Sequence, residues 1–335
     1  FEYPPQADTY RTKVRSFLDA NLPKDWKGIG ALNHAAAAEW TEDWRKKLYS
    51  EGFLAITWPK EYGGQGLSHI ESLVLAEEFA RAGVPAGGPN DGFGIGMLGN
   101  TIIAVGTEEQ KRHYLPRALS GEDRWCQGYS EPAAGSDLGN LGCRAVLDGD
   151  EWVINGQKIW TSAGHLANYI FVLARTSPDD VKHRGITFLL VDMRQKGVEI
   201  RPIKMMSGDS EFNEVFFTDA RCPKENVVGE VNGGWMVAMT LLGNERGAGA
   251  VVSSISFRGE LDKLNALAQE KGLTKDPHIR QRLAQAHIKV EIMRFLGYRT
   301  LTAFMSGNQP GPEASIGKLW WSEYHKEVTE LAIDI

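Results

Sequence analysis

The sequence predicts an α+β protein in which a β domain lies between two helical domains. In the first and last thirds, apolar residues recur every three or four positions, as Tyr10 and Val14 do, and this spacing is typical of amphipathic helices. In the middle third, apolar and polar residues alternate in short runs separated by turn sequences. We therefore expect a helical domain over residues 1–120, a compact antiparallel β-barrel or sandwich over 121–232, and a helical bundle over 233–335.

Two capping boxes mark helix starts in the first third. Ser68 is followed three residues later by Glu71, and Thr107 by Gln110. In such a pair, each side chain satisfies a backbone amide at the helix start. A Trp-rich helix is also expected from about Ala38.

Turn sequences divide the middle third into strands. Asp148-Gly149 predicts a hairpin, and Asn155-Gly156 predicts a second turn. The expected strands cover 144–147, 151–154, 157–160, 169–174, 185–191, 198–202 and 214–218.

Three helices are expected in the last third. One begins at Gly233 and continues to Ala250, and a second begins at Asp276-Pro277, a capping residue followed by proline. A third begins near Pro312 and reaches Ile335 without a stop signal, so we expect residues beyond it. The absence of an initiator Met predicts missing N-terminal residues as well.

Composition limits the function classes. The 335 residues are 42% hydrophobic and 24% charged, with a net charge of −6, which argues against nucleic acid as a partner. No charge-free apolar run is long enough to span a bilayer. Three scattered cysteines have neither metal-ligand nor redox-pair spacing. We therefore expect no metal site, reduced thiols and a cytoplasmic location.

One glycine pattern is a poor guide to function. Gly94, Gly96 and Gly99 satisfy the dinucleotide-binding fingerprint, but turn-forming residues precede them where a strand is required. We expect a closely packed helix or loop there.

Two stretches combine aromatic rings, hydroxyls and small residues. The first, 125–137, reads Trp-Cys-Gln-Gly-Tyr-Ser-Glu-Pro-Ala-Ala-Gly-Ser-Asp, and the second, 157–164, reads Gln-Lys-Ile-Trp-Thr-Ser-Ala-Gly. Such residues suit a flat polar heterocycle, since rings cover its faces while hydroxyls and amides reach its edges. The alternative is an interdomain loop that happens to be rich in small residues.

Together these stretches resemble the middle domain of the acyl-CoA dehydrogenases. The resemblance continues, in order, through Trp58–Gly64, Phe216–Pro223 and Asn232–Trp235, and so covers nearly the whole chain. It implies an FAD enzyme that oxidises an acyl-CoA thioester to the trans-2-enoyl-CoA and passes electrons to an electron-transferring flavoprotein or a similar acceptor.

The resemblance also assigns residues. It places Gln127, Tyr129, Ser130, Trp160, Thr161 and Ser162 at the flavin, and Ser136 and Arg246 at the substrate. For Trp160 the alternative role is core packing, and for Arg246 it is a surface salt bridge.

Glu245 is the expected base that removes the α proton. Many members carry this base in a C-terminal loop, but a subset, including isovaleryl- and long-chain-type enzymes, carries it on the first long C-terminal helix, where Glu245 lies. The residue shares a helical face with Trp235, Ala238 and Leu242, so we expect burial to raise its pKa. The alternative is a structural ion pair.

Family homodimers usually complete the FAD site with an Arg-x-x-Phe-Gly segment, and residues 269–277 contain none. We therefore expect either an unlike partner subunit or substitution by Lys271, Lys275 and Arg280. The combination resembles a bacterial subgroup that degrades steroid or terpenoid acyl-CoAs. Two further functions stay open: a flavin monooxygenase or acyl-CoA oxidase on the same fold, and a non-catalytic partner subunit.

Overall fold

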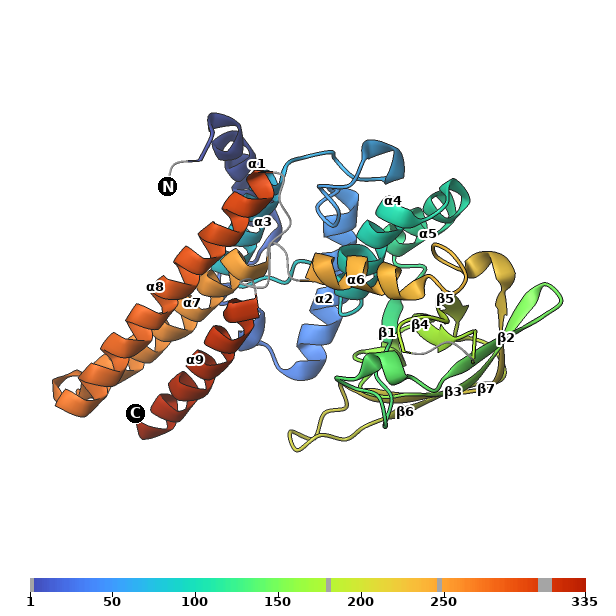
Figure 1. The fold of residues 1–335 in the computed structure, drawn as a ribbon. Helices are drawn as coiled ribbons and strands as arrows, with labels where there is room; N and C mark the ends of the chain where they lie inside the picture. The colour runs from blue at the N-terminus through green and yellow to red at the C-terminus, as the bar shows by residue number, and fades with distance from the viewer. Residues whose placement is uncertain (1–2, 179–181, 246–248, 307–314) are drawn as a thin grey trace. The chain divides into compact units, whose positions relative to one another are not determined.

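The computed structural model describes residues 3–178, 182–245, 249–306 and 315–335 (Figure 1). Its helices are α1 (Pro5–Asn21), α2 (His34–Ser50), α3 (His69–Ala82), the π-helix η3 (Gly92–Gly99), α4 (Asn100–Val105), α5 (Glu108–Ser120), α6 (Gly234–Glu245), α7 (Gly249–Glu270), α8 (Pro277–Met305) and α9 (Ser315–Asp334). Its strands are β1 (Trp125–Gly128), β2 (Arg144–Asp148), β3 (Glu151–Lys158), β4 (Tyr169–Arg175), β5 (Ile186–Asp192), β6 (Val198–Pro202) and β7 (Asn213–Pro223). Short 3₁₀ turns are η1 (Ile29–Ala31), η2 (Lys60–Tyr62), η4 (Leu138–Asn140), η5 (Gly164–Leu166), η6 (Lys224–Asn226) and η7 (Leu273–Lys275). Among the described residues, no helix combines the length and the apolar surface that a membrane crossing needs.

These elements form two compact units that are not contiguous in sequence. The helical unit contains residues 1–43, 67–86 and 246–335, and the β unit contains residues 44–66 and 87–245. The domain boundaries expected at residues 120 and 232 stay a prediction.

The C-terminal helices of the helical unit pack through regularly spaced apolar residues. Helices α7, α8 and α9 pack against one another, and Leu283, Val290 and Val328 lie in their shared core. The predicted start of α8 is confirmed, because Asp276 Oδ1 accepts hydrogen bonds from the amides of His278 at 2.8 Å and Ile279 at 3.1 Å. Leu319 of α9 lies outside this core and is 66% exposed.

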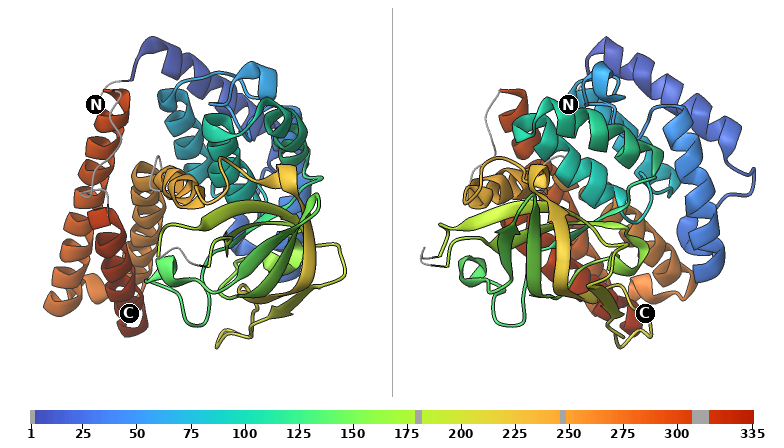
Figure 2. Two further views of the ribbon diagram at one scale, coloured as in Figure 1. Left: turned by 45° about the vertical axis from the view of Figure 1, so that its right-hand side comes forward. Right: turned by 90° about the vertical axis from the view of Figure 1, so that its right-hand side faces the viewer.

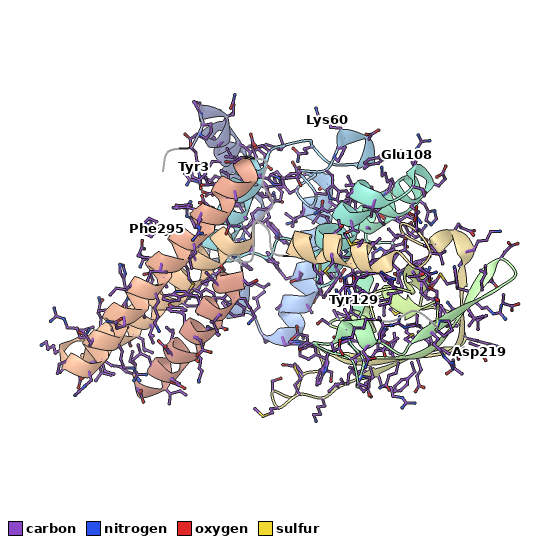
Figure 3. The ribbon with its side chains drawn as sticks, viewed as in Figure 1. Tyr3, Lys60, Glu108, Tyr129, Asp219 and Phe295 are labelled. Atoms are coloured by element: carbon purple, nitrogen blue, oxygen red, sulfur yellow. The ribbon has the colours of Figure 1, made fainter. Side chains whose placement is uncertain are left out.

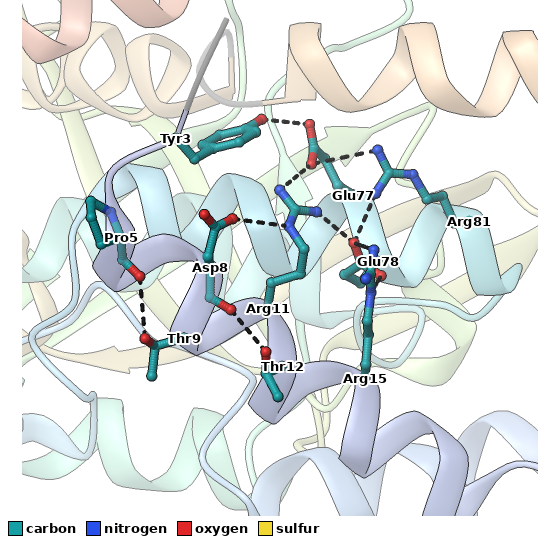
Figure 4. Close-up of polar contacts among 10 residues, drawn as sticks. All are labelled: Tyr3, Pro5, Asp8, Thr9, Arg11, Thr12, Arg15, Glu77, Glu78 and Arg81. Carbon is teal, nitrogen blue, oxygen red and sulfur yellow. Dashed lines mark hydrogen bonds and ion pairs between the residues drawn. The ribbon is translucent and has the colours of Figure 1, made fainter.

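A charged network joins α1 to α3 (Figure 4). Arg11 lies 3.0 Å from Glu77 and 2.5 Å from Glu78, and Arg15 donates to Glu78 at 2.8 Å. Tyr3 donates to Glu77 at 2.6 Å. Both glutamates are only 5% exposed. Burying a carboxylate is costly unless cations and donors surround it, which is what this network provides.

The β unit is built on one mixed sheet. Within the described residues it has seven strands in the order β1-β4-β2-β3-β7-β6, with β5 paired to β4. Most neighbours are antiparallel as expected, but β1 and β2 each pair with β4 in parallel. The predicted fold class is therefore confirmed, with two parallel pairings that the strand pattern did not reveal.

Strands β4 and β5 are buried on both faces. Because successive side chains point to opposite faces, Phe171 and Phe188 enter one core while Ile170 and Leu189 enter the other. Helices α4, α5 and α6 and the π-helix η3 contribute to the first core, and they lie on one side of the sheet (Figure 2). The second core lies within the curled sheet itself.

One predicted turn is wrong. Asn155-Gly156 does not end a strand, because β3 continues to Lys158 and only its register against β7 shifts there. A Cβ on Gly156 would lie 2.7 Å from Cys143 Cα, so the glycine permits a close approach of backbones instead of a turn. The hairpin at Asp148-Gly149 and both capping boxes are confirmed.

The glycine fingerprint lies in the largely buried π-helix η3. This confirms the closely packed helix or loop that was expected because no strand precedes the glycines. Cβ atoms at Gly94 and Gly99 would lie 3.0 Å from Trp125 and 2.1 Å from Trp58. These glycines therefore serve close packing.

The start of α6 is held against β5. Asn232, at φ 67°, donates its amide to Thr187 Oγ1 at 2.8 Å, and a Cβ on Gly234 would lie 2.5 Å from the amide nitrogen of Phe188. The expected continuous helix from Gly233 to Ala250 is described as α6 and α7, with residues 246–248 outside the description.

Candidate active site

The two stretches singled out in the sequence meet in the β unit. Gln127 lies on β1, Tyr129 and Ser130 follow it directly, and Trp160 and Thr161 follow β3. The amide of Ile159 donates a hydrogen bond of 2.9 Å to the carbonyl of Ser130. Segments about thirty residues apart in the sequence are therefore joined backbone to backbone.

A buried ion pair ties the same segments together. Lys158 is fully buried, and its ammonium donates to Glu131 Oε1 at 2.7 Å and to the carbonyl of Tyr129 at 3.1 Å. The Glu131 carboxylate also accepts from the amides of Gly142 at 2.6 Å and Cys143 at 3.0 Å. Sequence reasoning assigned neither charged residue a role. A lysine beside two large apolar residues at a strand end was the available signal.

The Tyr129 ring points into the core of the β unit. It is 6% exposed and meets Phe171 and Phe188 edge-on at 5.9 and 6.4 Å between ring centroids (Figure 3 labels Tyr129). Its neighbour Ser130 is half-buried, and Gln127 is also half-buried. Tyr129 thus anchors this segment through its side chain, while its carbonyl accepts from Lys158.

Trp160 has the opposite character. Its side chain is 58% exposed, its backbone has φ 61°, and its ring lies nearly perpendicular to that of Phe212, with 5.9 Å between the ring centroids. The left-handed region costs a residue with a Cβ about 1–2 kcal/mol. Such strain, held at a large exposed aromatic, is typical of a functional position.

Thr161 is buried with an unused hydroxyl. Its amide and carbonyl both bond to Asn213, at 3.0 and 2.9 Å, and its side chain is 1% exposed. Its Oγ1 has no hydrogen-bond partner among the residues that the structure describes. A buried hydroxyl without a partner is costly, so this site has an unmet demand for a polar ligand atom. Ser162, the next residue, is half-buried.

The thiol nearest the ion pair is held neutral. Burial raises the pKa of Cys143 to about 11, although the Lys158 cation acts in the opposite direction. Cys143 therefore contributes an amide donor to Glu131 and no charge of its own.

The proposed substrate residues are described only in part. Ser136 is exposed in the loop between Glu131 and Gly142. Glu245 is the last residue of α6, but its side chain lies outside the described residues, and Arg246 lies outside them entirely. The structure thus brings the predicted flavin residues together and leaves Glu245 and Arg246 as predictions.

Comparison with known proteins agrees with the resemblance. Family models match three consecutive segments: the acyl-CoA dehydrogenase N-terminal domain over residues 4–122, the middle domain over 126–220 and the C-terminal domain over 232–335. The chain is 42% identical over 333 residues to acyl-CoA dehydrogenase IpdE1 of Mycobacterium tuberculosis, covering 98% of this chain and 85% of the relative.

Solved structures give the same result. The Tcur3481-Tcur3483 steroid ACAD matches with a TM-score of 0.84 and 35% identity, covering 99% of this chain and 84% of the other. The ChsE4-ChsE5 complex from Mycobacterium tuberculosis matches with a TM-score of 0.82 and 34% identity, covering 100% and 85%. This chain belongs to the acyl-CoA dehydrogenase family.

Proposed function

We propose that this chain binds FAD and dehydrogenates an acyl-CoA thioester between its α and β carbons. The observation that carries the proposal is the pairing of exposed, strained Trp160 with the unused hydroxyl of buried Thr161. These residues fit a flavin, because one offers a ring face for stacking and the other a hydrogen bond to a ring edge. FAD is the general cofactor of the family to which the chain belongs.

In the proposed reaction Glu245 takes the α proton of the thioester. When bound, FAD supplies the acceptor for the hydride that leaves the β carbon, and the electron pair of the broken α C–H bond forms the new double bond. Glu245 follows Ala238 and Leu241, both fully buried, at helical steps of seven and four. The spacing supports Glu245 as a member of the same helical face as these two apolar residues.

The remaining positions bind and orient. Ser130 and Ser162 flank the same site and offer hydroxyls to the flavin, and Gln127 offers its side-chain amide. Ser136 and Arg246 are proposed to contact the acyl-CoA. The closure of the loop between Glu131 and Gly142 supports a defined place for Ser136.

The proposed substrate is a steroid-derived acyl-CoA. The match to a solved structure named as a steroid ACAD covers 99% of this chain, and this likeness supports the substrate class. The names of two matching structures each pair two proteins, which supports assembly with an unlike acyl-CoA dehydrogenase subunit that completes FAD binding. We propose an electron-transferring flavoprotein or a similar protein as electron acceptor, in the cytoplasm.

An anaerobic substrate panel tests the activity. The protein, alone and with a candidate partner subunit, is loaded with FAD and mixed with straight-chain, branched and steroid-side-chain acyl-CoAs. Loss of the flavin absorbance should be fastest with a steroid side chain. Flavin content per polypeptide, measured in the same samples, tests the assembly. Full occupancy in a pure homo-oligomer would exclude the need for a partner, and a colourless complex after FAD addition would exclude the function.

Substitution of Trp160 tests the flavin position. Trp160→Ala should release FAD more readily, because one ring face loses its stacking partner. Trp160→Phe keeps an aromatic face and should restore most of the retention. Equal FAD retention in all three proteins would place the flavin elsewhere.

A further inference from the structure

We infer that Lys158 and Glu131 act as positioning residues that couple two segments of the site, the loop 131–142 and the strand end 157–161. The role of those segments rests on the proposed function. Their coupling is a property of the chain itself, and it is measurable without cofactor or substrate.

Glu131, at the start of the loop, is hydrogen-bonded to the residues at the end of the loop. Its Oε2 accepts from the amide of Gly142, while its Oε1 accepts from the amide of Cys143 at the other end of the loop. A tight turn within the loop joins Glu131 and Ala134 by two backbone hydrogen bonds of 3.0 and 3.1 Å. Because Ser136 lies in this loop, the position of the carboxylate fixes the loop that presents Ser136.

Lys158 carries the connection to the other segment. It is the last residue of β3, two positions before Trp160, and its side chain is fully buried. Its ammonium reaches Glu131 Oε1 and the carbonyl of Tyr129, so it contacts the segment that leads from β1 into the loop. One cation thus bonds to both ends of the Tyr129–Glu131 segment.

Each charge depends on the other. The Glu131 side chain is 9% exposed and that of Lys158 is fully buried, so neither is solvated if its partner is removed. Breaking a buried pair by removing one partner is far more costly than replacing both charges. A change at Lys158 should therefore loosen the loop 131–142, more than ten residues away in sequence, as well as its own strand end.

Loss of a pair with a purely structural role would loosen only the residues around the substitution or the whole unit. The β unit offers a matched comparison in Arg117 and Asp123, which form two hydrogen bonds of 2.9 and 2.8 Å. The Asp123 side chain is fully buried, and within the described residues the Arg117 side chain pairs only with Glu122 and Asp123, not with either site segment. Asp123→Asn thus removes a buried carboxylate from an ion pair away from the site, although the Arg117 side chain is 28% exposed and can still reach solvent.

Hydrogen–deuterium exchange of the flavin-free protein tests the coupling. In Lys158→Met, peptides covering residues 131–143 and peptides covering 157–165 should both exchange roughly tenfold faster or more than in the wild type. Glu131→Gln should give the same two-segment pattern. Asp123→Asn should leave both segments within about twofold of the wild type. Acceleration confined to the mutated segment, or an equal change in Asp123→Asn, would overturn the inference.

The double variant Lys158→Met/Glu131→Gln guards against misfolding of the single variants, because it leaves no uncompensated buried charge. Both segments should again exchange faster than in the wild type, and wild-type protection in both would overturn the coupling. With FAD and acyl-CoA, the single variants should lower kcat and raise KM together. If the exchange pattern is found but acyl-CoA reduces the flavin of neither the wild type nor any variant, the proposed function fails while the coupling stands.

Discussion

Replacing Thr161 by valine should stabilise the flavin-free protein. Valine keeps the shape of threonine and replaces the hydroxyl by a methyl group; that hydroxyl is buried and has no partner among the described residues. Burial of a hydroxyl without a hydrogen bond costs about 1–3 kcal/mol in proteins. The free energy of unfolding should rise by about that amount, and Tm by a few °C, since 1 kcal/mol shifts Tm by about 2–4 °C in a unit of this size.

Thr187 provides a control with the opposite sign. It is fully buried, but its Oγ1 accepts from the amide of Asn232 at 2.8 Å and lies 2.7 Å from Thr176 Oγ1. Thr187→Val removes these bonds and leaves the Asn232 amide without its acceptor, so it should destabilise the protein by about 1–3 kcal/mol. Urea and thermal unfolding of the flavin-free proteins measure both changes.

Thr161→Val should also weaken flavin binding. A ligand that binds only the folded state stabilises it in proportion to the logarithm of its concentration over Kd. Saturating FAD should therefore raise the Tm of the wild type more than that of Thr161→Val. If Thr161→Val destabilises the flavin-free protein as Thr187→Val does, the hydroxyl is satisfied by the protein and is not held for a ligand.

Three further predictions concern packing, pH and thiols. Gly99→Ala should cost about 1–3 kcal/mol in urea unfolding, because its Cβ would lie 2.1 Å from the Trp58 ring, whereas Gly96→Ala, with nothing within 4 Å, should cost little. Burial alone would raise the pKa of Glu78, but hydrogen bonds from two arginines of α1 outweigh it and leave that pKa lowered. The stability that this pKa shift provides is fully present above the unfolded pKa of about 4.3 and is lost as pH falls through the folded pKa. The unfolding free energy of Glu78→Gln should therefore fall less steeply on acidification than that of the wild type, whereas Glu39→Gln, at an exposed residue, should behave as the wild type does. Burial raises the pKa of all three cysteine thiols, so iodoacetamide should label them only after unfolding; labelling of the native protein would contradict the burial.

Local patterns in the sequence were sufficient to predict most helices and strands. The two capping boxes and the Asp276-Pro277 start depend on neighbouring residues, and each is found in the structure. The parallel pairing of β1 with β4 was not predictable in this way, because partners about forty residues apart leave no local signal. The turn expected at Asn155-Gly156 failed for a related reason, since the glycine serves contact with Cys143, a residue of another segment.

The candidate site shows the same division. Trp160 and Thr161 were recognisable from their residue types and the family resemblance, but their contrast in burial depends on the fold around them. The bond between Lys158 and Glu131 was not predicted, because nothing in the sequence shows that two charges twenty-seven positions apart share one buried site. Tyr129 stays a predicted flavin residue, and its ring packs edge-on against two stacked phenylalanines of β4 and β5, a contact that the sequence did not reveal.

The most direct test of the proposed dehydrogenase is anaerobic stopped-flow reduction of the FAD-loaded protein by its best acyl-CoA, compared with Glu245→Gln. Glutamine keeps the size of the side chain but cannot take the α proton. The variant should retain fold and flavin while flavin reduction slows by several orders of magnitude. Glu230→Gln, an exposed residue shortly before α6, should react as the wild type does. Near-normal flavin bleaching in Glu245→Gln would contradict Glu245 as the base, and no bleaching of the wild type by any acyl-CoA would contradict the dehydrogenase itself.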